Sequence, residues 1–206
     1  MRKRMGIAGG LLLLACGCAP LMKSAPSFAG QFLTISIEPV VAFPPEVTLD
    51  GFHYSSTGDT GETLNNAFLT DMGDDMKKKA GALIAAQVQP YTAALIGAFK
   101  DEIVRRGIYK GVVDQGGDVR LRLTVLRYGL VALSGSGLMK PVLEVKGDLL
   151  LGGLGVVWTR TFAVDEKSGQ TMAVSLADLV AGPGGFQKGF GAASTEAAQG
   201  VLAELK

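Results

Sequence analysis

Residues 143–164, LEVKGDLLLGGLGVVWTRTFAV, contain two alternating segments joined by a glycine-rich turn. In the first segment apolar and charged residues alternate, which predicts a strand with one buried face; the apolar positions are Leu143, Val145, Leu149 and Leu151. Gly152, Gly153 and Gly155 allow a tight reversal of the chain. The next strand has its own apolar set, which is Val156, Trp158, Phe162 and Val164. We therefore predict an antiparallel hairpin.

The segment before this hairpin predicts a third strand with an irregularity. Its apolar residues first occupy odd positions, which are Val119, Leu121, Leu123 and Val125. After Val125 the phase changes, and Leu126, Tyr128 and Leu130 are apolar. A β-bulge or a strong twist near Val125 would keep one face buried.

Further strands are predicted near the start of the domain. Leu33, Ile35 and Ile37 alternate with polar residues, which predicts a strand that Pro39, Pro44 and Pro45 limit in length. A short extended piece is expected around Val47 and Leu49. Residues 51–66 are rich in Gly, Ser, Thr, Asn and Asp, so we expect a loop there.

Two main helices are predicted from apolar residues three or four positions apart. The first helix follows Asp74 or Asp75 and ends at Gly107; its apolar positions are Ala80, Ile84, Val88, Tyr91, Leu95, Phe99 and Ile103. Pro90 interrupts it, so a kink or two abutting helices are expected near Gln89. The last helix begins near Phe186, with Phe190, Ala193, Ala197, Val201 and Leu205 on one face. These elements predict an α+β fold, in which two main helices pack on one face of an antiparallel or mixed sheet of about four strands.

The first twenty residues have the three parts of an export signal. Arg2, Lys3 and Arg4 form a basic start, and residues 5–15 form an apolar run. That run is too short to cross the roughly 30 Å hydrocarbon core as a stable helix. It is therefore expected to be a signal peptide and not a permanent span.

The apolar run ends in Leu13-Leu14-Ala15-Cys16, which resembles the lipobox of bacterial lipoproteins. The resemblance implies cleavage before Cys16, a diacylglyceryl group on its sulfur and, usually, acylation of the new amino terminus. Cys18 is the alternative lipidation site, with Ala15 three residues before the cut. This covalent lipid is the only non-protein group that the resemblance implies. Neither a metal nor another cofactor is expected.

The resemblance divides the chain into a signal peptide at 1–15, a lipidated tether at 16–30 and a single periplasmic domain at 31–206. Cleavage leaves 191 of the 206 residues and removes three of the 20 basic residues, so 17 basic residues face 19 acidic ones, a formal charge of −2. This near-neutral balance argues against a nucleic-acid partner. Because Gly17 follows Cys16 and aspartate does not, the resemblance implies the inner leaflet of the outer membrane; the periplasmic face of the inner membrane is the alternative.

The order of elements after the lipobox looks like that of two groups of small envelope lipoproteins. These are the transport-auxiliary lipoproteins and the lipoprotein subunit of lipopolysaccharide-assembly translocons. The resemblance covers element order only and carries over no partner-binding residue. It implies a binding, assembly or transport-accessory role with an envelope protein as the partner.

No catalytic residue is predicted. Ser134 and Ser136 do not lie in a Gly-x-Ser-x-Gly nucleophile elbow, and the single histidine, His53, has no second histidine with which to bind zinc. We therefore expect a protein that is not an enzyme. The alternatives are a purely structural envelope lipoprotein and a hydrolase whose site is assembled from distant residues.

One loop is a candidate contact with a partner or with lipid. Apolar residues flank the Ser-Gly stretch at 134–137, and the candidates are Leu130, Val131, Leu133, Leu138 and Met139. The structural alternative is a flexible hairpin between two strands.

Overall fold

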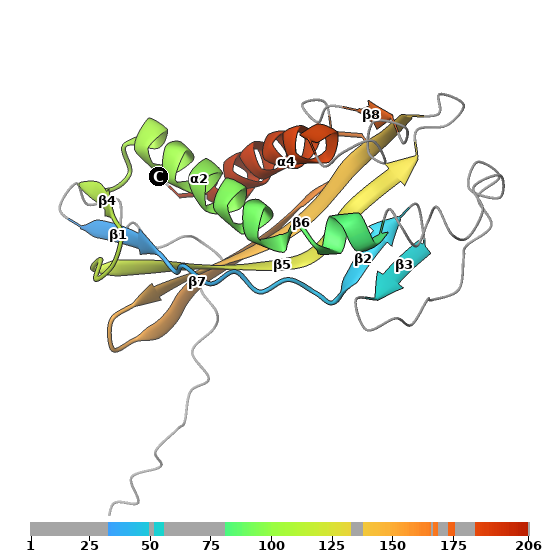
Figure 1. Ribbon diagram of the computed structural model, residues 1–206. Coiled ribbons are helices and arrows are strands. Elements are labelled where there is room, and N and C mark those ends of the chain that lie inside the picture. The colour runs from blue at the N-terminus through green and yellow to red at the C-terminus, as the bar shows by residue number, and fades with distance from the viewer. Residues whose placement is uncertain are drawn as a thin grey trace, which may run out of the picture.

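The computed structural model describes residues 33–49, 52–55, 81–132, 138–165, 167–168, 173–175 and 184–205. They form one mixed β-sheet with helices α2 (Val88–Arg106) and α4 (Gly184–Leu202) side by side on one face (Figure 1). The predicted α+β class and the two-helix layer are confirmed. The described residues contribute eight strands to the sheet, where the sequence predicted about four.

Three long antiparallel strands make up the largest part of the sheet. Strand β5 (Val119–Ala132) pairs with β6 (Leu138–Leu151), which pairs with β7 (Gly155–Val164). The predicted hairpin is therefore confirmed. The β5–β6 register shifts between Val125 and Arg127, where the sequence predicted a bulge. The extra residue turns Leu126 outward and returns Tyr128 to the buried face.

The chain between 34 and 49 runs parallel to β5 along its other edge. Strand β1 (Thr34–Ile37) pairs with the start of β5, and β2 (Glu46–Leu49) pairs with it at Gly129 and Leu130. Between these strands, Ala42 forms an isolated bridge with Thr124. The three prolines lie where this segment leaves the ladder, so their missing N–H groups cost no strand hydrogen bond.

Three short strands were not predicted. Strand β3 (Phe52–Ser55) pairs with β2, β4 (Gly111–Val113) pairs with β1, and β8 (Val174–Ser175) pairs with the start of β6. The predicted loop at 51–66 was therefore wrong for residues 52–55, and His53 lies in a strand opposite Thr48. β4 and β8 have only three and two residues, too few for a recognisable alternation, and β3 lies in a stretch otherwise rich in turn-forming residues.

The predicted break near Pro90 is confirmed. Residues 81–85 are helical, residues 86–87 form a turn, and α2 begins at Val88. Pro90 is the third residue of α2, where a helix has no intrahelical use for its N–H group. The helix ends as predicted at Gly107, whose φ of 60° is left-handed.

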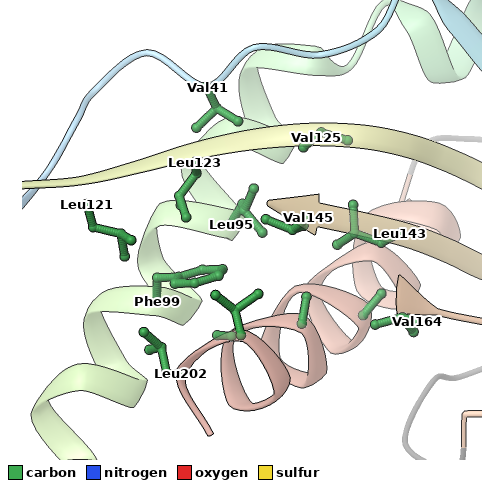
Figure 2. Close-up of a cluster of buried hydrophobic side chains, with 14 of the residues drawn as sticks. Val41, Leu95, Phe99, Leu121, Leu123, Val125, Leu143, Val145, Val164 and Leu202 are labelled. Carbon is green, nitrogen blue, oxygen red and sulfur yellow. The ribbon is translucent and has the colours of Figure 1, made fainter. Parts of the chain in front are cut away.

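The core lies between the two helices and the β5–β6–β7 sheet. Figure 2 shows Leu95 and Phe99 of α2 and Leu202 of α4 directed at Leu121, Leu123 and Val145 of the sheet. A Cβ atom at Gly147 would lie 2.8 Å from the Val201 side chain, so the missing side chain lets α4 approach β6 closely. Among the described residues, no helix is long and apolar enough to cross a membrane.

A chain of aromatic rings, all buried except the partly buried Phe43, joins both helices to the sheet. Tyr91 stacks on Phe190 at 4.5 Å between ring centroids and meets Tyr128 edge-on at 6.5 Å, and Phe43 meets Tyr128 at 5.3 Å. Burial strongly raises the pKa of Tyr91, and the charge interaction with nearby Tyr128 raises it further. Burial also raises the pKa of Tyr128, and it raises the pKa of Tyr109 to about 12.

These tyrosines predict a loss of stability in alkaline solution. Above the ordinary tyrosine pKa of 10.0 the unfolded chain releases these protons while the folded chain keeps them. The free energy of unfolding should therefore be level up to about pH 10 and then fall, by about 1.4 kcal/mol per pH unit for each buried tyrosine. Urea denaturation at pH 9 to 11 measures this, and Tyr91→Phe should reduce the slope. A level profile, or an unchanged slope in Tyr91→Phe, would contradict the prediction.

Candidate binding surfaces

The structure divides the predicted contact loop. Leu130, Val131 and Met139 are buried in the β5–β6 ladder, so their side chains do not face solvent. Leu138 has 37% of its surface exposed, and Leu133 lies outside the described residues. Of the candidates in the described part of the chain, Leu138 alone is open to a partner. Both candidate lipidation sites, Cys16 and Cys18, lie outside the described residues, so lipidation stays a prediction.

The sheet face opposite the helices carries paired charges. The Glu38 carboxylate accepts from Arg122 Nε at 2.8 Å and lies 3.8 Å from Arg120 Nη1. Next to this pair, Asp148 lies 3.0 Å from Lys146 Nζ and accepts from the Thr159 hydroxyl. Asp148 is buried beneath these partners although it belongs to the outer face. We call this surface the outer face; the alternation of charged with apolar residues predicted it.

A hollow of about 300 Å³ opens at one end of the outer face, where β1 meets the loop between β4 and β5. Its charged lining residues, Glu38, Asp114 and Arg120, already have partners. Asp114 accepts from Lys100 Nζ at 2.9 Å, and this hydrogen bond lowers the pKa of the Asp114 carboxyl. Charged groups of both signs therefore line the hollow, together with the apolar residues Ile37, Pro39 and Val40.

Asp118 fastens the wall of this hollow to β1. Its carboxylate accepts from the backbone N–H and from the hydroxyl of Thr34, both at 2.8 Å, and these bonds lower the pKa of Asp118. A Cβ atom at neighbouring Gly117 would lie 2.6 Å from Ser36 N, so the backbone approach there requires glycine. The turn before β5 is therefore held against β1 by these hydrogen bonds and by the close backbone contact.

A buried carboxylate joins the two helices. Glu102 of α2 accepts from Arg105 and Arg106, and its pKa is lowered first by the hydrogen bond from Arg105. Arg106 Nη1 also donates to the Leu202 carbonyl of α4 at 2.7 Å. No sequence pattern marks this acid, because only the fold brings the end of α4 over it. Its three bonds make it a structural group of the helix pair.

The longest free strand edge in the described part of the chain belongs to β7. Among the described residues β7 pairs with β6 alone over residues 155–164, so its other edge presents unpaired backbone N–H and C=O groups. Natural edge strands are usually protected by proline, lysine or a bulge in the middle of the edge. β7 has no proline and no lysine, and its one bulge, at Val157, lies near the start of the strand rather than in its middle. Its one charged residue, Arg160, pairs with Glu204 near the end of α4. Thr159, Thr161 and Ala163 are exposed beside this edge.

The described residues contain no group of three or more His, Cys, Asp and Glu side chains able to hold a metal. Ser194 of α4 is buried, and its hydroxyl has no hydrogen-bond partner there. Its neighbour Ala193 belongs to the helix–sheet core, and Ser194 does not line the hollow. The accessible features are therefore the polar outer face with its hollow and the β7 edge, which are suited to binding.

Comparison with known proteins finds similar structures only. No family model matches the chain, and no curated protein matches it. A crystal structure of protein XCC0632 from Xanthomonas campestris, of the family DUF330, has a TM-score of 0.46 at 15% identity and covers 88% of this chain and 89% of that one. A single-substitution variant of PelC from Paraburkholderia phytofirmans, solved as a dodecamer, has a TM-score of 0.40 at 14% identity and covers 86% and 87%. At these values neither structure transfers a residue or a role to this chain.

Proposed function

We propose that this chain is a membrane-anchored envelope lipoprotein that acts as a non-catalytic binding or assembly subunit. The lipobox at Cys16 supports the anchor, and the free edge of β7 supports the binding role. Gly17 favours the inner leaflet of the outer membrane, with the domain facing the periplasm. The partner is an envelope protein that adds an extended segment along β7.

The edge suits such a partner for a physical reason. Residues 158–164, beyond the bulge at Val157, offer a continuous row of backbone donors and acceptors, and an added strand satisfies them without moving the sheet. The exposed Thr161 and Ala163 are small, so they do not obstruct an incoming backbone. β6 and α4 hold β7 in place from the opposite edge and from the covered face, so the edge is rigid before binding.

A photo-crosslinker placed at position 161 of the full chain tests the binding role in living cells. Irradiation is expected to yield one discrete adduct with an envelope protein. The same crosslinker at Thr195, an exposed position of α4, should not yield it. No adduct at 161, or equal adducts at both positions, would contradict binding along β7. An adduct of twice the chain mass would identify the occupant as a second copy.

A variant with charged residues beside the β7 edge gives a second test of the binding role. Thr161 lies opposite Lys146, and Ala163 lies opposite Glu144. The double variant Thr161→Glu, Ala163→Lys therefore suits the β6 neighbours while it places charges beside the edge, as natural edge strands do. Recovery of the crosslinked partner by affinity purification should fall at least about tenfold, as expected for a loss of some 1.4 kcal/mol. Thr195→Glu, Ala203→Lys makes the same changes on α4 and in the turn that follows it, and should leave recovery unchanged.

A further inference from the structure

The turn between β6 and β7 is an exposed apolar tip. Residues 149–159, LLLGGLGVVWT, form eleven consecutive positions without a charged side chain. Leu154 has 71% of its surface exposed and Val156 has 52%. The turn is well defined, since Leu154 N–H donates to the Leu151 carbonyl at 3.0 Å and Gly153 and Gly155 have positive φ. The fold of this chain therefore presents two apolar side chains on a fixed hairpin.

This tip lies at the end of the sheet where the chain enters the domain. One row of paired residues crosses the sheet there and contains Ile35, Val119, Leu151 and Gly155. Leu33 lies two residues before Ile35, and Leu154 lies one residue before Gly155, so both are close to this row. Figure 1 shows the start of β1 and the β6–β7 turn at the same, left-hand end. Leu138, the other exposed large apolar residue of the β6–β7 hairpin, lies at the far end of β6.

The length of the tether favours this end as the one that faces the membrane. Leu33 lies seventeen positions after Cys16. A flexible chain of that length spans about 23 Å on average. β5 alone, with 14 residues, is about 46 Å long. A lipid on Cys16 therefore holds the near end of the sheet closer to the bilayer than the far end.

We propose that the β6–β7 turn is a second membrane contact, in which Leu154 and Val156 enter the boundary between lipid headgroups and acyl chains. The inference rests on the proposed lipid anchor, which brings the turn to the bilayer. Two apolar side chains suit this depth, because interfacial segments bury their apolar face only about 5–10 Å. Anchor and turn together fix the orientation of the sheet. They leave the far part of the β7 edge and the outer face open to the periplasm.

Spin labels on the processed, lipidated full chain in phosphatidylcholine vesicles test this contact. In a Cys18→Ser background, a nitroxide is placed at Leu154→Cys or, as the matched control, at Leu138→Cys. The label at 154 should be accessible to oxygen and protected from a water-soluble nickel complex, with an oxygen-to-nickel accessibility ratio several times that at 138. Equal ratios at the two positions would overturn the proposal. Spin–spin coupling between copies at 154 would also overturn it, because the turn would then contact a second chain.

The single tryptophan gives a second measurement that needs no label. Trp158 lies three residues from Gly155, about 10 Å along the strand. Brominated lipids should quench its fluorescence, and Leu154→Asp, Val156→Asp should reduce that quenching while Leu138→Asp should not. Undiminished quenching in the double variant would overturn the contact. Flotation of the chain with the vesicles separates the two proposals. If the chain floats with the vesicles but the label at position 154 is exposed to water, only the contact of the turn is refuted. If the chain does not float with the vesicles, the lipid anchor is refuted as well.

Discussion

Replacing Gly129 by alanine is expected to remove a large part of the folding stability of the domain. Gly129 has a φ of 148°, and a Cβ atom there would lie 1.8 Å from the carbonyl oxygen of Thr48. The opposing atoms belong to the backbone of β2, so no side-chain rotation relieves the clash. β2 would have to separate from β5 at the point where Thr48 pairs with Gly129.

The cost follows from what β2 covers. Val47, Leu49 and Leu130 are buried at this junction, and exposing a buried aliphatic side chain costs about 1.5–3 kcal/mol. Loss of two of them removes about 3–6 kcal/mol, compared with a total stability of about 5–15 kcal/mol for a typical domain.

Thermal and urea denaturation followed by circular dichroism measure this effect, with Gly97→Ala as the matched control. A Cβ atom at Gly97 in α2 would have no neighbour within 4 Å, so that variant should be unchanged or more stable by up to about 1 kcal/mol. Equal melting temperatures for the two variants would show that β2 does not approach β5 as closely as described.

The sequence predicted the elements whose burial pattern or backbone chemistry is visible in their own residues. β5, β6 and β7 have 10 to 14 residues each, so the alternation of apolar and polar positions is long enough to recognise. The same alternation exposed the bulge after Val125, since a shift of parity has few other physical causes. Pro90 and Gly107 marked the ends of α2 because their backbone chemistry restricts them locally.

The remaining features depend on which segments pair, and pairing is not local. Thr34–Leu49 lies parallel to β5, whose residues are about 80 positions away, and nothing in the two segments specifies that partner. The free edge of β7 has the same origin, because a strand becomes an edge only through the arrangement of the others. The predicted contact loop at 130–139 depends on pairing in the same way, since pairing decides which of its residues are buried. Leu130 and Met139 are apolar beside a Ser-Gly stretch, yet the β5–β6 ladder extends past them and buries them.

Replacing Cys16 by serine is expected to abolish lipid attachment and membrane retention. The sulfur of Cys16 is the predicted acceptor of the diacylglyceryl group, and serine offers no thiol. A single acyl chain gives only marginal membrane binding, while the two or three chains of a processed lipoprotein give stable anchoring. Loss of the thiol therefore changes the anchor as a whole, and the β6–β7 turn, with two exposed apolar side chains, is too small to replace it.

Metabolic labelling with radioactive palmitate, followed by membrane fractionation, measures this directly. Wild type and Cys18→Ser should be labelled and should sediment with the membranes, whereas Cys16→Ser should be unlabelled and either uncleaved or soluble. Cys18 is the matched control because it lies two residues away and would be the acceptor in the alternative register. Loss of label in Cys18→Ser alone would move the lipid to Cys18. Label that persists in both single variants and in the double variant would show that the chain is not a lipoprotein of this kind, because no other cysteine remains to carry the lipid.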